Sequence, residues 1–169
     1  MSDGGDPYTA EPLPDDILLE LGRLVWAAIN LEDVTYPLCR SVQPRFGPFD
    51  DVFISRRIDQ ARKDLKRRPA DDLRKLADAW LVEAKAALEE RNGVMHSVPT
   101  VYLQADDLDR SPEVTGQWLT HFPRDRSRPV VRTPLTIEGL SRIRERLERA
   151  RLGWNELASE LWANRLGLY

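Results

Sequence analysis

Four long segments of this chain repeat apolar residues every three or four positions, and that spacing limits the fold more than any other feature. The segments cover residues 15–42, 49–67, 70–95 and 136–165. Because an α-helix turns once in about 3.6 residues, this spacing gathers the apolar side chains on one face of each predicted helix. Such helices bury their apolar faces against one another. The sequence therefore predicts an all-α fold, an up-and-down bundle of four long helices.

The residues predicted to face the core share this helical spacing, and most are Leu, Ile, Val, Ala or Trp. They are Ile17, Leu18, Leu21, Leu24, Val25, Ala28, Ile29 and Leu31 in the first segment; Val52, Ile54, Ile58, Ala61 and Leu65 in the second; Leu73, Leu76, Ala77, Trp80, Ala84, Ala87 and Leu88 in the third; and Leu140, Ile143, Leu147, Ala150, Trp154, Leu157 and Leu161 in the last. Between residues 142 and 151, five arginines alternate with Glu145 and Glu148, which predicts ion pairs within the last helix.

Local signals mark where these helices begin, bend or end. Pro37 is expected to kink or interrupt the first helix near Thr35, because proline lacks the N–H that a helix interior uses. Asp71 and Asp72 lie in the first turn of the third helix, where negative charge complements the helix dipole. Thr136 is the predicted N-cap of the last helix.

The composition is that of one soluble domain, with 169 residues of which 41% are hydrophobic and 31% charged. Residues 1–14 are acidic and rich in Gly and Pro, so we predict a disordered tail followed by a single domain at 15–169. This start lacks the apolar core of a signal peptide, and no apolar run has the length that a bilayer requires. Cys39 is the only cysteine, which excludes an intramolecular disulfide and makes a reducing, cytoplasmic location without membrane contact the expectation.

Residues 98–134 differ in character from the helical segments. Short β-prone runs at 98–104, 114–122 and 130–132 are separated by clusters of Asp, Arg and Pro. We interpret this segment as an extended insertion or a small β-hairpin before the last helix. Within it, Trp118 could stack on a base or a partner, whereas His121 lacks neighbours at metal-ligand spacing and is predicted to be a surface residue.

A hexapeptide at residues 91–96, Arg-Asn-Gly-Val-Met-His, closes the third predicted helix. We call this hexapeptide the motif. Cleavage of RNA without a metal needs a base for the 2′-hydroxyl proton, an acid for the leaving 5′-oxygen and a cation at the phosphorane. Histidine, with an ordinary pKa near ~6.5, suits the proton transfers, and arginine grips a phosphate in two places. We therefore interpret His96 as the acid and base, Arg91 as the phosphate stabiliser and Asn92 as the orienting group.

Other chemistries find little support in the sequence. The chain contains no glycine-rich phosphate loop and no G-x-S-x-G element. Two histidines and one cysteine do not make a convincing zinc site, so we expect no metal and no cofactor. The net charge of −3 argues against non-specific coating of nucleic acid, although a local basic groove would still suit a nuclease.

The pattern R-N-x-x-x-H resembles the signature of the HEPN family, small all-α domains that include many metal-independent endoribonucleases. The resemblance covers roughly residues 15–165 and implies a toxin or phage-defence ribonuclease that acts on RNA. It also implies a homodimer with a composite site at its interface, and an antitoxin or regulatory protein as a further partner. One branch of the family has a tyrosine two residues beyond the histidine. Here that position is Val98, which does not support regulation through such a tyrosine.

The spacing within the motif raises a geometric difficulty. Residues five apart on an ideal helix diverge by about 140°, so Arg91 and His96 do not share one face. They could converge if the helix loosens at Gly93, or each could point into a groove shared with a second subunit. The alternative is structural: Arg91 caps the last carbonyls or pairs with an acidic residue, and His96 is a buried hydrogen-bonding group.

Secondary candidates lie on the first helix and in two basic stretches. Glu32, beside Asn30, could reach across the bundle to orient Arg91, or it could be a solvated surface carboxylate. The basic stretches, at 51–68 and 124–132, could form a phosphate-binding rim or simply be solvated faces. The residues assigned to RNA binding are Arg56, Arg57, Arg62, Arg124, Arg126 and Arg128.

Two functions from different classes fit these observations. The first is a homodimeric, metal-independent endoribonuclease that uses Arg91, Asn92 and His96. The second is a non-catalytic helical domain for dimerisation or protein interaction, which the acidic net charge, the single motif histidine and the variable segment 98–134 favour. The stability of a His96→Ala variant separates them, because a buried structural histidine costs more to remove than an exposed catalytic one.

Overall fold

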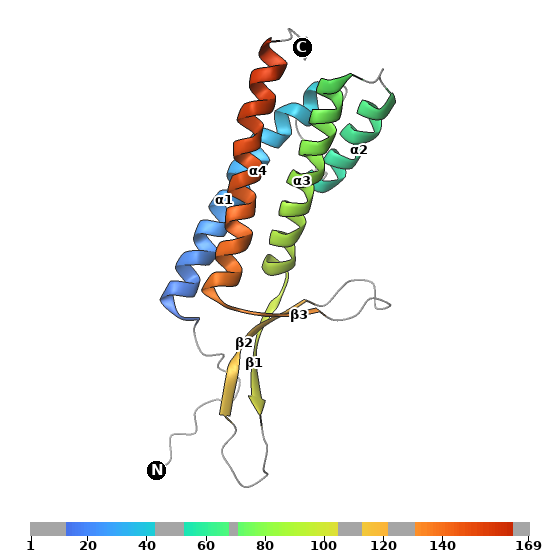
Figure 1. The fold of residues 1–169 in the computed structure, drawn as a ribbon. Coiled ribbons are helices and arrows are strands. Elements are labelled where there is room, and N and C mark those ends of the chain that lie inside the picture. Colours follow the sequence, from blue (N-terminus) through green and yellow to red (C-terminus); the bar gives the residue numbers. More distant parts are fainter. Residues whose placement is uncertain (1–12, 43–52, 68–70, 105–112, 122–130, 164–169) are drawn as a thin grey trace, which may run out of the picture.

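The computed structural model describes residues 13–42, 53–67, 71–104, 113–121 and 131–163. Over these residues the chain forms four helices, with three strands between the third and the fourth (Figure 1). The helices are α1 (Asp15–Val42), α2 (Ile54–Arg67), α3 (Asp72–Met95) and α4 (Ile137–Ala163), and the strands are β1 (Val98–Gln104), β2 (Glu113–His121) and β3 (Val131–Pro134). The predicted helical bundle is confirmed.

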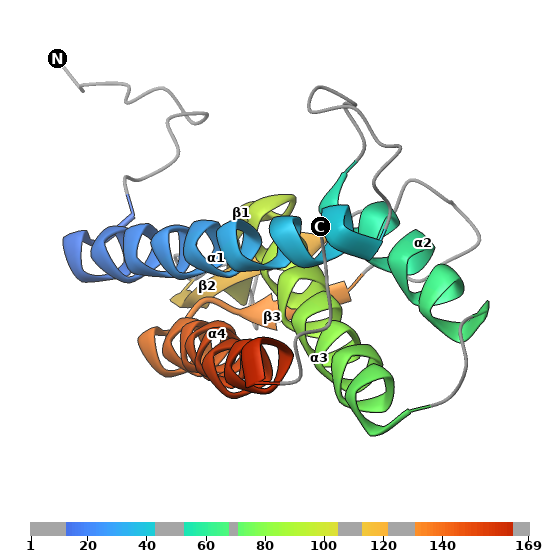
Figure 2. The ribbon, with the colours of Figure 1, turned by 90° about the horizontal axis from the view of Figure 1, so that it is seen from above.

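The directions of the helices depart from the predicted up-and-down order. Asp59 of α2 pairs with Lys85 of α3, and Arg62, which lies later in α2, pairs with Asp78, which lies earlier in α3. These two helices are therefore antiparallel. Arg146 of α4 pairs with both Glu83 and Glu90 of α3, so these two helices are in contact. Figure 1 shows that α4 is antiparallel to α3. Figures 1 and 2 show α1 and α4 running in the same direction, away from the sheet. It follows that α1 and α2 are parallel. The prediction that each helix runs opposite to the one before it, as in an up-and-down bundle, was therefore wrong.

The helix ends follow the predicted capping chemistry. The carboxylate of Asp71 accepts a hydrogen bond from the Arg74 N–H at 2.6 Å, which makes it the N-cap of α3. The hydroxyl of Thr136 accepts one from the Gly139 N–H at 3.0 Å at the start of α4. Pro37 does not interrupt α1, which continues through it to Val42. The predicted cap at Thr136 is thus confirmed, Asp71 is the N-cap of α3 and not a residue of its first turn, and an interruption at Pro37 is not observed.

Most of the residues predicted to face the core are buried or half-buried, with three exceptions on exposed faces. Leu18 and Ile29 of α1 and Leu76 of α3 lie on the surface, and Val52 lies outside the described residues. The sequence pattern also missed several fully buried positions, including Leu38 and Leu81. The cause is the width of the apolar stripe. A three-and-four spacing marks a stripe of about 100° or more around the helix, and contacts between helices decide which edge of that stripe is covered.

Between α3 and α4 the chain forms a three-stranded antiparallel sheet in the order β1-β2-β3 at one end of the bundle (Figure 1). Val98 pairs with Thr120 and Trp118 with Pro134, and the register of β1 and β2 shifts between Val101 and Leu103. A single hairpin would have two strands, whereas β3 adds a third and leads directly into α4. The sheet therefore joins the motif end of α3 to the start of α4.

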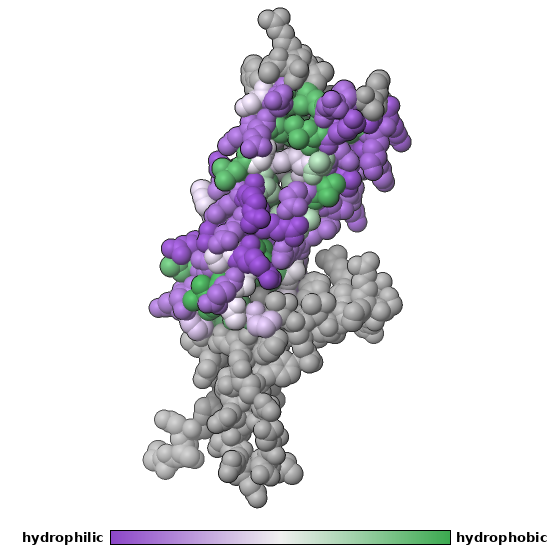
Figure 3. All heavy atoms as spheres, viewed as in Figure 1, coloured by the Kyte–Doolittle hydropathy of each residue, from purple (hydrophilic) through white to green (hydrophobic). Residues whose placement is uncertain are grey.

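Charged residues cover most of the bundle surface and link its helices. The face in Figure 3 is largely hydrophilic, with apolar side chains in small separate patches. Arginines on α4 were predicted to pair within their own helix, but the hydrogen bonds described for Arg146 reach Glu83 and Glu90 on α3. Arg144 bonds to Glu148 within the helix and also to Glu20 of α1. None of the described helices combines the length and the apolar character needed to span a membrane.

The thiol of Cys39 is buried in α1 and is expected to be unreactive in the folded protein. Burial raises the pKa of Cys39 to about 12, so little thiolate is present at pH 8, and thiolate is the reactive form. An aromatic disulfide reagent should therefore label the native chain far more slowly than the chain unfolded in guanidinium. Cys39→Ser supplies the background signal. Rapid stoichiometric labelling of the native protein would contradict this placement.

Candidate functional site

The motif lies in the last turn of α3, which ends at the junction with β1. The helix continues through Gly93 to Met95, and the His96 N–H donates to the Asn92 carbonyl at 3.0 Å. The hydroxyl of Ser97 donates to the Gly93 carbonyl and closes the turn. The helix thus does not loosen at Gly93, so Arg91 and His96 keep the divergence of about 140° that an ideal helix gives them.

Arg91 points toward the bundle and pairs with Glu32 of α1. Its Nη2 donates to Oε1 of Glu32, and both side chains are half-buried. Of the two alternatives left open for Glu32, the contact across the bundle is the one that the structure shows. The Nε of Arg91 is buried, and it is the only such side-chain atom without a hydrogen-bond partner in the part of the chain that the structure describes. A buried donor without a partner costs about 1–3 kcal/mol, so this guanidinium is held at an energetic cost.

His96 occupies the C-cap position of α3 with its side chain exposed to solvent. The structural alternative in which His96 is a buried hydrogen-bonding group is therefore excluded, whereas the alternative for Arg91, a pair with an acidic residue, is what the structure shows. Asn92 is half-buried and contributes its carbonyl to the helix end. Asn30 lies two residues before Glu32, which on a helix places it about 160° around the axis. Asn30 therefore does not share the side of α1 that faces Arg91.

Within one chain, then, the motif supplies two separate chemical groups. The first is a permanent cation fixed by a carboxylate on a neighbouring helix. The second is a free imidazole on the outer side of the same helix end. A phosphate bound by both would need a second surface, which is why a composite site with another subunit stays a prediction.

The arginines that were predicted to bind RNA differ in exposure and in contacts. Arg56 is exposed, but Arg57 is buried, with its guanidinium 4.6 Å from the ring centre of Tyr36. Arg62 bonds to both oxygens of Asp78, at 2.6 and 3.4 Å. The assignment of Arg57 to a phosphate-binding rim was wrong, because stacking on Tyr36 of α1 takes it out of solvent. Arg124, Arg126 and Arg128 lie outside the described residues.

The sequence reasoning also missed an exposed apolar surface on α1. We call it the α1 face and define it by Leu18, Leu19, Gly22, Trp26 and Ile29. Leu18 and Ile29 were predicted to face the core, and the predicted stripe did not include Leu19 or Trp26.

No protein-family model, no curated protein and no solved structure matches this chain. Among the described residues, no three His, Cys, Asp or Glu side chains are grouped as a metal site requires.

Proposed function

We propose that this chain is a metal-independent endoribonuclease of the HEPN type, acting through Arg91 and His96. The observation that carries the proposal is the pair between Glu32 and Arg91 at the same helix end as an exposed His96. A carboxylate that fixes an arginine from a neighbouring helix is the support that a phosphate-binding guanidinium needs. An exposed histidine at the same helix end, on another side of it, is available for proton transfer.

The chemistry assigns one role to each residue. A 2′-oxygen of RNA attacks the adjacent phosphorus and gives its proton to the imidazole of His96. The new O2′–P bond forms as the P–O5′ bond breaks, and Arg91 stabilises the charge that develops on the phosphorane. The leaving 5′-oxygen takes a proton from a second imidazole, supplied by His96 of the partner subunit. The products are a 2′,3′-cyclic phosphate and a 5′-hydroxyl.

Replacing His96 with alanine tests this role. His96→Ala should reduce cleavage of total RNA in EDTA by roughly 10²-fold or more, the usual contribution of a proton-transfer group. Because the side chain is exposed, the melting temperature should change little. The readout is the rate of appearance of 2′,3′-cyclic phosphate ends.

The matched control is His121→Ala, which removes the only other histidine of the chain. It should leave the rate near that of the wild type. Equal cleavage by wild type and His96→Ala, or no cleavage by the wild type on any RNA, would rule out the catalytic role.

A second candidate is a non-catalytic helical domain that binds a second copy or another protein. It is favoured by the α1 face and by the divergence of Arg91 from His96. In this case the wild type would assemble but would not cleave RNA. A toxin or phage-defence setting, with an antitoxin or regulatory partner, belongs to the ribonuclease proposal and derives from the family resemblance.

A further inference from the structure

Tyr36 of α1 is an exposed aromatic side chain whose ring is supported on one face. It is 37% exposed, and the guanidinium of Arg57 lies over its ring, 4.6 Å from the ring centre. Arg57 itself is only 4% exposed, so it supports the ring from the packed side, between α1 and α2. Because the guanidinium covers one face of the ring, the exposed surface of Tyr36 belongs to the other face and to the ring edge. A flat aromatic surface of fixed orientation therefore faces solvent.

Tyr36 lies between two cations on the same side of α1. Glu32, Tyr36 and Arg40 follow one another at intervals of four residues, which places each about 6 Å beyond the last along the helix axis. Glu32 holds Arg91 of α3. Arg40 is exposed and has no ion-pair partner among the residues that the structure describes. We call Arg91, Tyr36 and Arg40 the Tyr36 row.

A cation, an aromatic ring and a second cation in a row match the repeating parts of a single nucleic-acid strand. Such a strand alternates phosphates with flat bases. Arginine binds phosphate through charge-assisted hydrogen bonds, and a base of any kind stacks on an aromatic ring. The two ends of the row, at Glu32 and Arg40, are about 12 Å apart along α1, a distance that a short stretch of extended strand spans. The row therefore fits a strand that lies along α1.

We propose that the Tyr36 row binds the nucleotide beside the cleaved phosphate, with its base stacked on Tyr36 and its outer phosphate on Arg40. The position of the cleaved phosphate, at Arg91, rests on the proposed function. The stacked base must be unpaired, since bases that stack on aromatic side chains are those of single strands, loops and bulges. Stacking tolerates every base, so the row selects a single-stranded stretch and not a particular sequence.

A strand bound in this way leaves the motif end of α3 open. Figure 1 shows that α1 runs away from the sheet, whereas α3 ends beside it. Tyr36 and Arg40 therefore lie progressively farther from the motif end than Glu32 does. The side of α3 that carries His96 stays uncovered, as the partner subunit in the proposed function requires.

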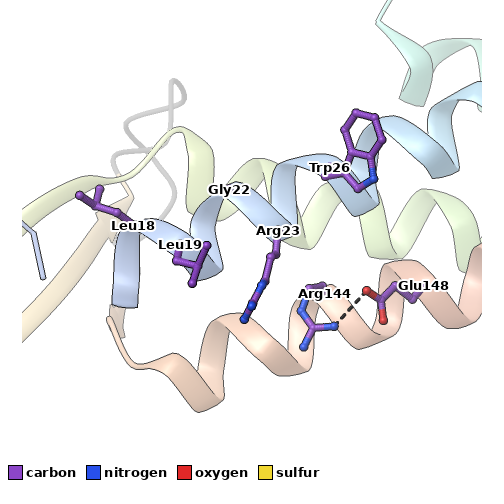
Figure 4. A pocket seen from close by; sticks show the side chains of 7 residues that line it. All are labelled: Leu18, Leu19, Gly22, Arg23, Trp26, Arg144 and Glu148. Carbon is purple, nitrogen blue, oxygen red and sulfur yellow. Dashed lines mark hydrogen bonds and ion pairs between the residues drawn. The ribbon is translucent and has the colours of Figure 1, made fainter. Parts of the chain in front are cut away.

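Trp26, the other exposed aromatic residue of α1, offers a contrast. It is 65% exposed and borders an open groove of about 600 Å³ between α1 and α4, and Figure 4 shows it projecting away from Arg144 and Glu148. Arg23 of this groove pairs with Glu20. Arg144 pairs with Glu20 and with Glu148. The cations near Trp26 are thus engaged by carboxylates, so Trp26 serves as a matched control for the aromatic position of the row.

Binding of a short single-stranded 2′-O-methyl RNA tests the row without cleavage, because the methyl group blocks the attacking oxygen. Tyr36→Ala should weaken binding roughly tenfold or more, the usual contribution of stacking on one base. Tyr36→Phe keeps the ring and should bind as the wild type does. Trp26→Ala should also leave the affinity unchanged. Fluorescence anisotropy of the labelled oligonucleotide measures each dissociation constant.

An abasic oligonucleotide of the same length separates stacking from a change in the fold. It keeps the phosphates and lacks the bases, so Tyr36→Ala should bind it as tightly as the wild type does. An equal loss on both oligonucleotides would overturn the proposal, because Tyr36 would then act by holding Arg57 and the shape of α1. A wild type that does not bind the 2′-O-methyl RNA at low salt would also overturn it, as would a Tyr36→Ala variant that binds this RNA with full affinity.

Arg40→Gln tests the outer phosphate through the salt dependence of binding. Losing one contact to a phosphate should lower the slope of the logarithm of the binding constant against the logarithm of the salt concentration by about 0.7. Tyr36→Ala should leave this slope unchanged. Arg142→Gln, at an exposed position on α4, controls for the loss of one positive charge. A slope that Arg40→Gln does not change would overturn the placement of the phosphate.

Failure of the Tyr36 row and failure of the proposed function give different results. A wild type that binds the 2′-O-methyl RNA through Tyr36 but leaves ordinary RNA intact would contradict the ribonuclease and keep the row. Cleavage that needs His96 but is unaffected by both Tyr36→Ala and Arg40→Gln would keep the ribonuclease and overturn the row.

Discussion

Replacing Trp80 with alanine is expected to lower the free energy of unfolding by about 3–5 kcal/mol, the range for truncating a buried aromatic residue. Trp80 joins α3 to α4: its Nε1 donates to the Ala150 carbonyl at 2.8 Å, and its ring lies 5.3 Å from that of Trp154. A Cβ atom at Gly153 would lie within van der Waals contact of the indole edge, so α4 approaches Trp80 closely there. The substitution opens a cavity and removes a hydrogen bond between α3 and α4.

For a chain of this size, the loss corresponds to a melting temperature about 6–20 °C lower. The matched control is the same substitution at Trp26, which is 65% exposed where Trp80 is 7% exposed. Measured at a concentration where the chain is monomeric, Trp26→Ala should change stability by no more than about 0.5 kcal/mol. Similar losses for the two variants would contradict the placement of Trp80 in the core.

The helices and the N-cap Thr136 could be predicted because the interactions that determine them lie close together in the sequence. Thr136 binds an N–H three residues away, and apolar spacing in one segment needs no knowledge of another. The direction of α2 could not be predicted in this way. It depends on contacts such as those of Arg62 with Asp78 and Lys85 with Asp59, between residues that no local rule connects.

At the candidate site, too, some contacts could be predicted from the sequence and others could not. The contact between Glu32 and Arg91 was one of two alternatives that the sequence left open for Glu32, and the structure contains it. The burial of Arg57 was not predicted, because a basic run does not reveal which of its members packs on Tyr36 of another helix. The exposure of the α1 face was also missed, since helical spacing placed Leu18 and Ile29 in the core, although no neighbouring helix covers them.

The buried pair of Glu20 and Arg144 is expected to make stability depend on pH. Glu20 is 4% exposed, and it accepts a hydrogen bond from Arg144 Nε at 2.6 Å and a longer one from Arg23. The hydrogen bond from Arg144 is the main cause that holds the pKa of Glu20 below its ordinary value of 4.5. A carboxyl with a lowered pKa stabilises the fold above its unfolded pKa, and this contribution is lost as the pH falls through its folded pKa.

Replacing Arg144 with methionine, which keeps most of the side-chain volume, should therefore cost about 3 kcal/mol at pH 7, because it leaves a buried carboxylate without its main partner. At about pH 3 the cost should be smaller, since Glu20 is then increasingly protonated in both variants. Denaturant unfolding of both proteins across this range measures the difference.

Arg142→Met, at an exposed position on the same helix, controls for the loss of one positive charge and should have little effect at either pH. A cost for Arg144→Met that is the same at pH 3 and pH 7 would show that Arg144 acts through packing alone. A cost that shrinks with acid, and that largely disappears at pH 7 when Glu20→Gln is added, would assign it to the charge pair that joins α1 to α4.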